Sequence, residues 1–182
     1  MIWILARTIR LAAMVSVLVA VMTGASALPI GAQTASSDGP RIGASTGLPL
    51  PRFVSIKSGE VNVRRGPGTN YPIDWVFVRA GVPVEIIAES DHWRKIRDVD
   101  GATGWVHKQL LQGDRMALIL GAMNDMIDSP YGNFEVVARI EGGVIARLEA
   151  CDTGWCRLRV GSVEGWLPKS VIYGVYPEET FK

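Results

Sequence analysis

The sequence predicts an all-β protein in which two small β-barrels follow each other along the chain. Three observations support this prediction. Short β-type runs at 74–79, 84–89, 93–97 and 103–107 are each bounded by Gly, Pro or Asp. The pattern then occurs a second time. Finally, a closed barrel of about five short strands is one of the few ways in which about sixty residues avoid long exposed sheet edges.

The duplication is visible when the sequence is shifted along itself by 62 positions. This shift aligns Gly81 with Gly143 and Trp93 with Trp155, together with the pairs Val82 and Val144, Val84 and Ala146, Ile86 and Leu148, and Ile96 and Leu158. A shift of 61 aligns Gly104-Trp105 with Gly165-Trp166, Lys108 with Lys169 and Leu111 with Ile172. A period near sixty matches no solenoid or propeller repeat, so it indicates two copies of one domain with a one-residue deletion in one hairpin.

Residues 1–27 are typical of an export signal. Arg7 and Arg10 precede an apolar run at 11–22, and Ala25-Ser26-Ala27 supplies a small-x-small cleavage site. The apolar run is shorter than the roughly twenty residues of a membrane span. The apolar residues at 2–5 leave an uncleaved anchor as the alternative. We therefore expect a secreted or periplasmic protein with no stable membrane insertion after cleavage.

Residues 28–51 are rich in Ala, Gly, Ser, Thr and Pro and nearly lack charged and aromatic residues. Such a segment buries too little apolar surface to offset the entropy of ordering, so we expect a flexible tether. Removing residues 1–27 takes two of the 19 Lys and Arg and none of the 18 Asp and Glu, which leaves a formal charge of −1. A nearly neutral surface does not attract nucleic acid or anionic lipid.

The first copy is expected to begin with a strand at 52–57, followed by a long ordered loop at 66–72 at the mouth of the barrel. The prolines of this loop hold φ near −65°, and its glycines allow positive φ. The strand at 74–79 is apolar on both faces, which predicts that it is covered on both sides.

Alternation identifies the core-facing side chains of the next strands. Residues on one face are Val84, Ile86 and Ala88 in the first copy and Val144, Ala146, Leu148 and Ala150 in the second. In the following strand Ile96 and Leu158 point inward, whereas solvent-facing positions hold Lys95, Arg97, Arg157 and Arg159. By the same parity Trp93 and Trp155 face solvent. Either a bulge turns each ring inward to seal the barrel end, or each copy displays an aromatic ring beside two cations.

The remaining elements are short. Asp98-Val99-Asp100-Gly101 suits a tight hairpin, and the runs at 108–111 and 169–172 suit a short turn before the last strand. The linker at 113–115 is so brief that we expect two touching barrels forming one rigid body. A cluster of methionines is either packing at this junction or a pliable binding surface, and it comprises Met116, Met123 and Met126.

Several motifs of the first copy carry a family resemblance. The run Asn62-Val63-Arg64-Arg65-Gly66-Pro67-Gly68, the turn Gly81-Val82-Pro83-Val84, a lone Trp93 and Gly104-Trp105-Val106 resemble a bacterial Src-homology-3 (SH3-like) domain. The second copy is similar to the same family through Cys151-Asp152-Thr153-Gly154-Trp155-Cys156, Gly165-Trp166-Leu167 and Gly174-Val175-Tyr176-Pro177. The resemblance implies a tandem SH3-like protein of the type exported by Gram-negative (alphaproteobacterial) cells. We place domain 1 at 52–113, domain 2 at 114–176 and a C-terminal tail at 177–182.

The chain has two cysteines, Cys151 and Cys156. Export implies an oxidising compartment, and a hairpin loop between them brings their Cα atoms near the ~5.5 Å typical of a disulfide. The same positions in the first copy hold Glu89 and Arg94, which could cross the loop as an ion pair. Strand parity alone puts the cysteines on opposite faces, so a disulfide also requires a kink or bulge. Weaker alternatives are a zinc site, which usually has four ligands, and a nucleophile, which needs a base.

The sequence contains no recognisable catalytic constellation. Its carboxylates are scattered, and none lies in an apolar run that would raise its pKa. The leader, the tether and two domains leave no room for a catalytic domain. We therefore expect no enzyme, no cofactor and no metal.

The resemblance implies a secreted binding module that attaches envelope proteins to cell-wall peptides or other periplasmic ligands. Candidate ligand-binding residues are Asn62, Arg64, Tyr71, Trp75 and Trp105. Tyr71 is foremost, because loops on a rigid scaffold commonly carry binding sites. For each aromatic ring, packing in the core is the alternative.

Two further hypotheses remain open. The protein could be a scaffold that contacts or regulates another envelope protein, such as a wall hydrolase. It could also be an accessory protein with residual hydrolase activity. Three observations distinguish the hypotheses. A wall-binding module is retained on the cell wall, a scaffold crosslinks to one dominant partner, and residual hydrolase activity clears a wall-substrate gel.

Overall fold

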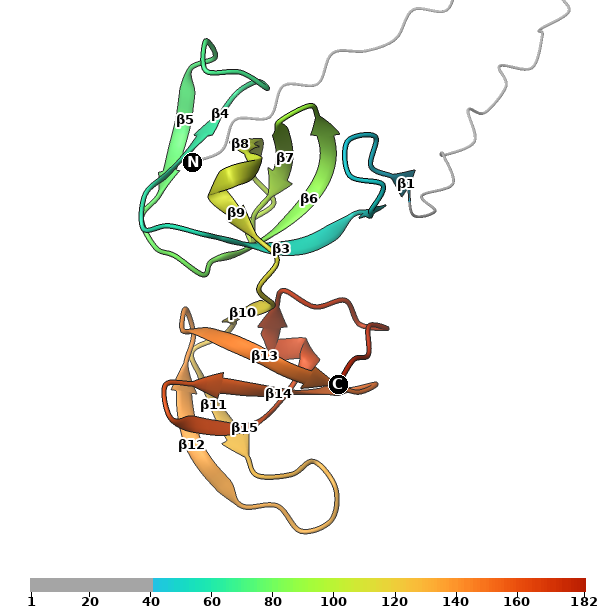
Figure 1. Ribbon diagram of the computed structural model, residues 1–182. Helices are drawn as coiled ribbons and strands as arrows, with labels where there is room; N and C mark the ends of the chain where they lie inside the picture. Colours follow the sequence, from blue (N-terminus) through green and yellow to red (C-terminus); the bar gives the residue numbers. More distant parts are fainter. Residues whose placement is uncertain (1–40) are drawn as a thin grey trace, which may run out of the picture. The chain divides into compact units, whose positions relative to one another are not determined.

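The computed structural model describes residues 41–182, which form two antiparallel sheets that each curl into a small barrel (Figure 1). The first sheet has the order β5-β4-β8-β7-β6-β3-β9, and the second has the order β12-β11-β15-β14-β13-β10-β16. The predicted all-β fold and its duplication are confirmed. The export signal expected at 1–27 lies outside the described residues, as does the part of the tether before residue 41.

The first barrel follows a separate hairpin of β1 (Arg41–Ile42) and β2 (Pro49–Leu50). Its elements are β3 (Arg52–Ile56), β4 (Val61–Arg64), β5 (Ile73–Phe77), β6 (Pro83–Ser90), β7 (Trp93–Arg97), β8 (Thr103–His107), the 3-10 helix η1 (Lys108–Leu110) and β9 (Leu111–Gln112). Those of the second barrel are β10 (Met116–Ile119), β11 (Met123–Ile127), β12 (Val136–Glu141), β13 (Ile145–Cys151), β14 (Trp155–Val160), β15 (Val163–Pro168), η2 (Lys169–Val171) and β16 (Ile172–Tyr173).

The two barrels repeat each other in detail. The short turns expected before the last strand are the helices η1 and η2. The expected deletion lies between β14 and β15, where the pair Arg159 and Glu164 encloses one residue fewer than the pair Arg97 and Thr103. Each barrel therefore has its own β framework and its own hydrophobic core.

In each Gly-Trp pair, the glycine lies against a buried side chain of the neighbouring strand. A Cβ on Gly104 would lie 2.4 Å from Val63 Cγ1, and one on Gly165 would lie 2.4 Å from Met126 Cγ. Val63 and Met126 are both fully buried. Only glycine fits at either position, because the side chain of the opposite strand occupies the space of a Cβ.

A β-bulge interrupts the first long strand of each barrel. The register shifts between Ile86 and Ala88 in β6 and between Leu148 and Ala150 in β13. A bulge adds one residue and so reverses which residues face inward beyond it. The expectation that Ala88 and Ala150 face the core is therefore wrong: they pair with Lys95 and Arg157 on the outer face.

Because of the bulge, the last inward-facing residue of β13 is Cys151, which forms the predicted disulfide with Cys156. The two Cα atoms are 4.1 Å apart, and both residues are buried. The equivalent pair in the first barrel is Glu89 and Arg94, with Arg94 Nε 3.5 Å from Glu89 Oε1. The expected ion pair is confirmed. An ion pair therefore links the two strands at this end of the first barrel, and a disulfide links them at the same end of the second.

Two further sequence expectations are wrong. The strand expected at 74–79 is the edge strand β5 and is not covered on both sides, since Val76 and Val78 are 38% and 75% exposed. The flexible tether does not extend to residue 51, because β1 and β2 form a hairpin within it. Leu50 reaches the core of the first barrel and supplies apolar burial that the composition of the segment did not predict.

Glu89 also holds this hairpin in place. Its carboxylate accepts hydrogen bonds from the backbone N–H groups of Ser45 and Thr46, each at 3.0 Å, from Thr46 Oγ1 at 2.7 Å and from Arg52 Nη2 at 2.8 Å. Burial raises the pKa of Glu89, but the hydrogen bonds from Thr46, Arg52 and Ser45 and the charge of Arg94 outweigh it and lower the pKa to about 2.

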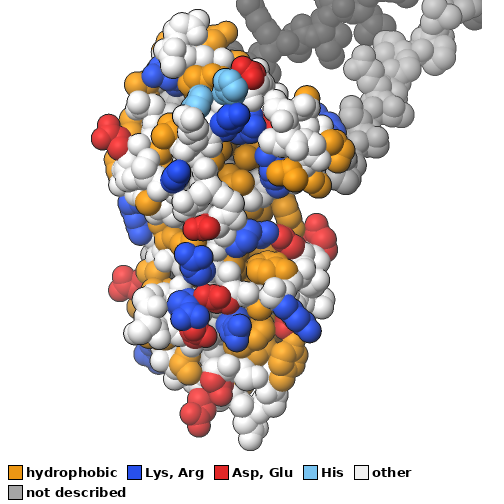
Figure 2. Space-filling model, viewed as in Figure 1, with side chains coloured by type: hydrophobic (Ala, Val, Ile, Leu, Met, Phe, Trp, Pro, Cys, Tyr) orange, Lys and Arg blue, Asp and Glu red, His pale blue; other side chains and the backbone are white. Residues whose placement is uncertain are grey.

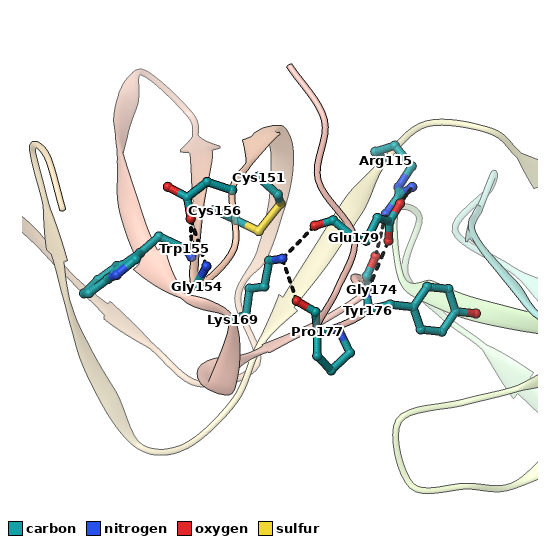
Figure 3. The surroundings of a disulfide bond; sticks show 11 residues. Arg115, Cys151, Gly154, Trp155, Cys156, Lys169, Gly174, Tyr176, Pro177 and Glu179 are labelled. Atoms are coloured by element: carbon teal, nitrogen blue, oxygen red, sulfur yellow. Dashed lines mark hydrogen bonds and ion pairs between the residues drawn. A yellow bond between two sulfur atoms is a disulfide. The ribbon is translucent and has the colours of Figure 1, made fainter. Parts of the chain in front are cut away.

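The C-terminal tail closes the second barrel at the matching place (Figure 3). Phe181 and Cys151 exchange two backbone hydrogen bonds, of 2.8 and 3.0 Å. Lys169 Nζ donates to the carbonyl oxygens of Pro177 and Glu179, and Arg115 pairs with the Glu179 carboxylate. The tail is thus a strand partner for the disulfide-bearing strand.

The two barrels touch, as expected from the short linker. Phe53 packs against the rings of Tyr173 and Tyr176, with centroids 5.2 and 4.8 Å apart. Tyr176 Oη donates to Glu85 Oε1 at 2.8 Å, and burial together with this bond raises the pKa of Tyr176. The methionines do not form one cluster: Met126 is core and Met123 is exposed, whereas Met116 Cε lies near Gly81.

We predict that reduction of the disulfide lowers the free energy of unfolding by about 2 kcal/mol, because the loop closed by Cys151 and Cys156 is short. Urea unfolding with and without reductant measures the difference, and mass spectrometry registers the matching two-dalton change. The Cys151→Ala/Cys156→Ala variant is the control and should not respond to reductant. An equal midpoint for the wild-type protein in both conditions contradicts the prediction.

The Glu89 carboxylate should make the first barrel sensitive to acid. Because its folded pKa lies below the ordinary value of 4.5, its stabilisation is complete above that pH and is lost as the pH falls toward about 2. Glu89→Gln should therefore be less stable than wild type at neutral pH and should show a flatter dependence over this acid range. Glu149→Gln, which removes a part-exposed carboxylate paired with Arg159, is the matched control. Parallel curves for wild type and Glu89→Gln would refute the assignment.

Candidate binding site

The candidate site lies on the outer face of β4, β8 and β7 in the first barrel. Inward-facing residues such as Val63, Ile96 and Val106 are fully buried. The alternate positions point outward and are half-buried: Asn62 and Arg64 on β4, Trp105 and His107 on β8, and Trp93 and Lys95 on β7. This face concentrates aromatic rings and hydrogen-bond donors on rigid strands.

The loop after β4 is folded back onto this face. Arg64 Nη1 donates to the carbonyl oxygen of Tyr71 at 2.7 Å. A Cβ on Gly66 would lie 2.3 Å from Tyr71 Cδ1, and one on Gly68 would lie 3.3 Å from Tyr71 Cδ2. The Tyr71 ring therefore packs on two glycines, and the glycines of the motif are needed for this close approach.

A hollow of about 150 Å³ opens between the loop and the strands, lined by Asn62, Arg64, Thr69, Trp93, His107 and Leu110. The rings of Trp93 and His107 meet edge to face with centroids 5.4 Å apart. His107 Nδ1 accepts from the backbone N–H of Gln109 at 3.4 Å, so in the neutral ring Nε2 carries the proton and is a donor. The two histidines lie next to each other on the surface of this barrel (Figure 2).

The predicted site residues do not all meet here. Asn62 and Arg64 line the hollow, and Trp105 lies beside Arg64 as its cross-strand partner. Tyr71 holds Arg64 through its carbonyl oxygen, and the residue as a whole is 41% exposed. Trp75 pairs with the buried Val63 and packs against the core, so the core alternative holds for this ring.

Sequence reasoning did not select Trp93, His107, Thr69 or Leu110 for the site. The alternation of inward and outward residues already indicated that Trp93 faces outward. Because β7 pairs with β8 without a bulge, the ring stays on the outer face, as Trp155 does in β14. His107 directly opposes Trp93. Leu110 belongs to η1, and its approach to the loop is set by tertiary packing.

The second barrel lacks two of the polar groups of this hollow, the side chains of Arg64 and His107. Pairing with the Gly-Trp strand makes Ile127 the counterpart of Arg64, and pairing with Trp155 makes Pro168 the counterpart of His107. Its loop folds differently, since Tyr131 Oη donates to Asp152. The two copies therefore share a framework but differ in surface chemistry.

Residues 41–182 contain no group of three or more His, Cys, Asp or Glu side chains that could hold a metal ion. The same part of the chain contains no helix with the length and hydrophobicity of a membrane span.

The bacterial SH3 domain family matches residues 57–113 and 122–174, more than half of the chain, and the chain belongs to this family. The chain is similar to a putative N-acetylmuramoyl-L-alanine amidase, YrvJ, of Bacillus subtilis (strain 168), with 27% identity over 128 residues. This match covers 64% of the chain and 24% of the amidase, so the chain spans about a quarter of this curated relative's length.

Among solved structures, the chain is similar to NlpC1 and NlpC2 from Trichomonas vaginalis, with identities of 11% and 10%. The alignments cover 72% and 68% of this chain and 48% of each of theirs, and both TM-scores are 0.32.

We predict that Gly66→Ala displaces the Tyr71 ring, because the added Cβ would overlap it. The expected cost is about 1 kcal/mol of stability, together with faster nitration of Tyr71 by tetranitromethane. Gly59→Ala is the control, since a Cβ there has no heavy atom within 4 Å. Equal nitration rates in the two variants would show that Tyr71 does not depend on Gly66.

Proposed function

We propose that this protein is an exported, non-catalytic binding protein that attaches to cell-wall peptides through the hollow of the first barrel. The observation that carries the proposal is the meeting of an aromatic wall with donors from Asn62, Arg64 and His107 on a rigid face. Such a combination suits an extended peptide, whose backbone needs acceptor and donor partners and whose side chains need an apolar surface.

The family supports this proposal, because bacterial SH3 domains are binding modules associated with the cell wall. The similarity to a putative amidase supports the same cellular setting outside the cytoplasm. The buried carboxylates support a non-catalytic role. Glu85 is bound by Arg97 and Tyr176, and Glu89 by Arg52 and Arg94, so neither is free to transfer a proton.

Retention on purified peptidoglycan sacculi tests the proposal. Trp93→Ala should weaken retention about tenfold, equivalent to ~1.4 kcal/mol, because it removes the aromatic wall. Trp155→Ala is the matched control, since it removes the equivalent ring from the second barrel. Tyr71→Ala should also weaken retention, because it removes the ring that packs on Gly66 and Gly68 and so loosens the loop whose backbone carbonyl oxygen accepts from Arg64. Equal retention of all variants would contradict the assigned site.

A scaffold role is the second candidate, and one observation favours it. The edge of the second barrel exposes large apolar side chains, with Tyr131 and Phe134 at 66% and 64% and Val136 and Val137 at 50% and 44%. Exposed apolar groups on an edge strand suit contact with another protein. In the sacculus experiment, this role corresponds to no retention and to one dominant crosslinked envelope protein.

A further inference from the structure

A second and larger hollow lies between the N-terminal hairpin and the outer face of β6 and β7. Its volume is about 420 Å³, and its lining residues are Arg41, Leu50, Pro51, Ile87, Ala88, Lys95 and Arg97. One wall consists of hairpin residues that precede the family match, which begins at residue 57. The hollow is therefore an addition to the domain rather than part of its matched framework.

The hairpin wall is firmly held. Four hydrogen bonds tie the Glu89 carboxylate to Ser45, Thr46 and Arg52. Leu50 is inserted in the core, and a Cβ on Gly43 would lie 2.5 Å from Glu89 Oε2. The β6 bulge turns Glu89 inward for this purpose and at the same time places Ala88 outward, on the floor of the hollow.

The lining combines cations with an apolar floor. Arg97 is already paired with Glu85, which also accepts from Tyr176. Within residues 41–182, neither Lys95 nor Arg41 forms a salt bridge, and the other acidic residue of β6, Glu89, is consumed by the hairpin and Arg94. Figure 2 shows Lys and Arg side chains in the recess beside the hairpin. The hollow thus has uncompensated positive charge above Leu50, Pro51 and Ile87.

We infer that this hollow binds the carboxylate end of a short peptide, with an apolar side chain of the peptide on its floor. Guanidinium and ammonium groups bind carboxylates through short, charge-assisted hydrogen bonds. A lone inorganic anion would satisfy Lys95 and Arg41 but would leave the apolar floor and most of the 420 Å³ unfilled. A membrane surface requires a dense basic patch, and this chain has a nearly balanced charge.

The two hollows lie on the same face of the first barrel. Arg64 on β4 and Lys95 on β7 are both cross-strand partners of Trp105 on β8. Neighbouring strands are about 4.8 Å apart, so the backbones of Arg64 and Lys95 are separated by about 10 Å, the reach of about three extended peptide residues. The inference goes beyond the proposed wall attachment, because it concerns a different hollow and a free carboxylate.

Titration of the purified, ¹⁵N-labelled protein with N-acetyl-Ala-Ala, followed by amide spectra, tests the inference. Binding of the free acid should be saturable and should shift the amide signals of Ile87, Ala88, Lys95 and Arg97. The C-terminal amide of the same dipeptide should bind about tenfold more weakly, because it lacks the negative charge. Inorganic phosphate should not compete at equal concentration.

Lys95→Gln should raise the dissociation constant about fivefold, because it removes one cation from the hollow. The matched control is Arg157→Gln, since Arg157 occupies the position of Lys95 in the second barrel and pairs with the corresponding alanine. The amide spectrum of each free variant verifies that its fold is intact.

Equal binding of acid and amide, equal shifts with phosphate, or absence of saturable binding would each overturn the inference. Trp93→Ala separates it from the proposed function. That variant should keep its response to the dipeptide and show about tenfold weaker retention on sacculi. If retention persists in Trp93→Ala while the dipeptide response depends on Lys95, the proposed site fails and the second site stands.

Discussion

The bulge in the first long strand of each barrel is the constraint on which much of this structure depends. It reverses the inward and outward parity after Ile86 in β6 and after Leu148 in β13. Without the reversal, Glu89 and Cys151 would face solvent, opposite to their partners across the hairpin. With it, each becomes the inner member of a pair that closes the barrel end, at the expense of one unpaired residue in the ladder.

Both barrels use this closed end to hold a segment from outside the repeat. In the first, Glu89 gathers backbone donors from the N-terminal hairpin. In the second, Cys151 pairs through its backbone with Phe181 of the C-terminal tail. The ion pair of Glu89 and Arg94 keeps a carboxylate that can accept hydrogen bonds from the hairpin. The disulfide has no such acceptor, so only the backbone of Cys151 is available to the C-terminal tail. The choice of cross-link therefore decides how each neighbouring segment is attached.

The two copies share the residues of the framework but differ in surface chemistry. Both copies have a glycine where a side chain of the opposite strand approaches the backbone closely, Gly104 in the first and Gly165 in the second. Core packing leaves no room for a Cβ at either position. Surface residues differ, since Arg64 and His107 of the first copy correspond to Ile127 and Pro168 of the second. The polar hollow belongs to the first barrel, and the second offers an apolar edge. Phe53, Glu85 and Tyr176 join the two bodies.

The amino-acid sequence alone predicts the all-β class, the duplication, the positions of most strands of the first barrel, the disulfide and its charged counterpart. These follow from local alternation and turn residues, which are properties of neighbouring residues, and from alignment of the two copies. Of the five predicted site residues, Asn62 and Arg64 line the hollow and Trp75 packs inward. Tertiary structure alone decided the location of each bulge, the ordering of the hairpin and the meeting of Trp93, His107 and Leu110. These depend on contacts between residues distant in sequence, whose energies no local pattern records.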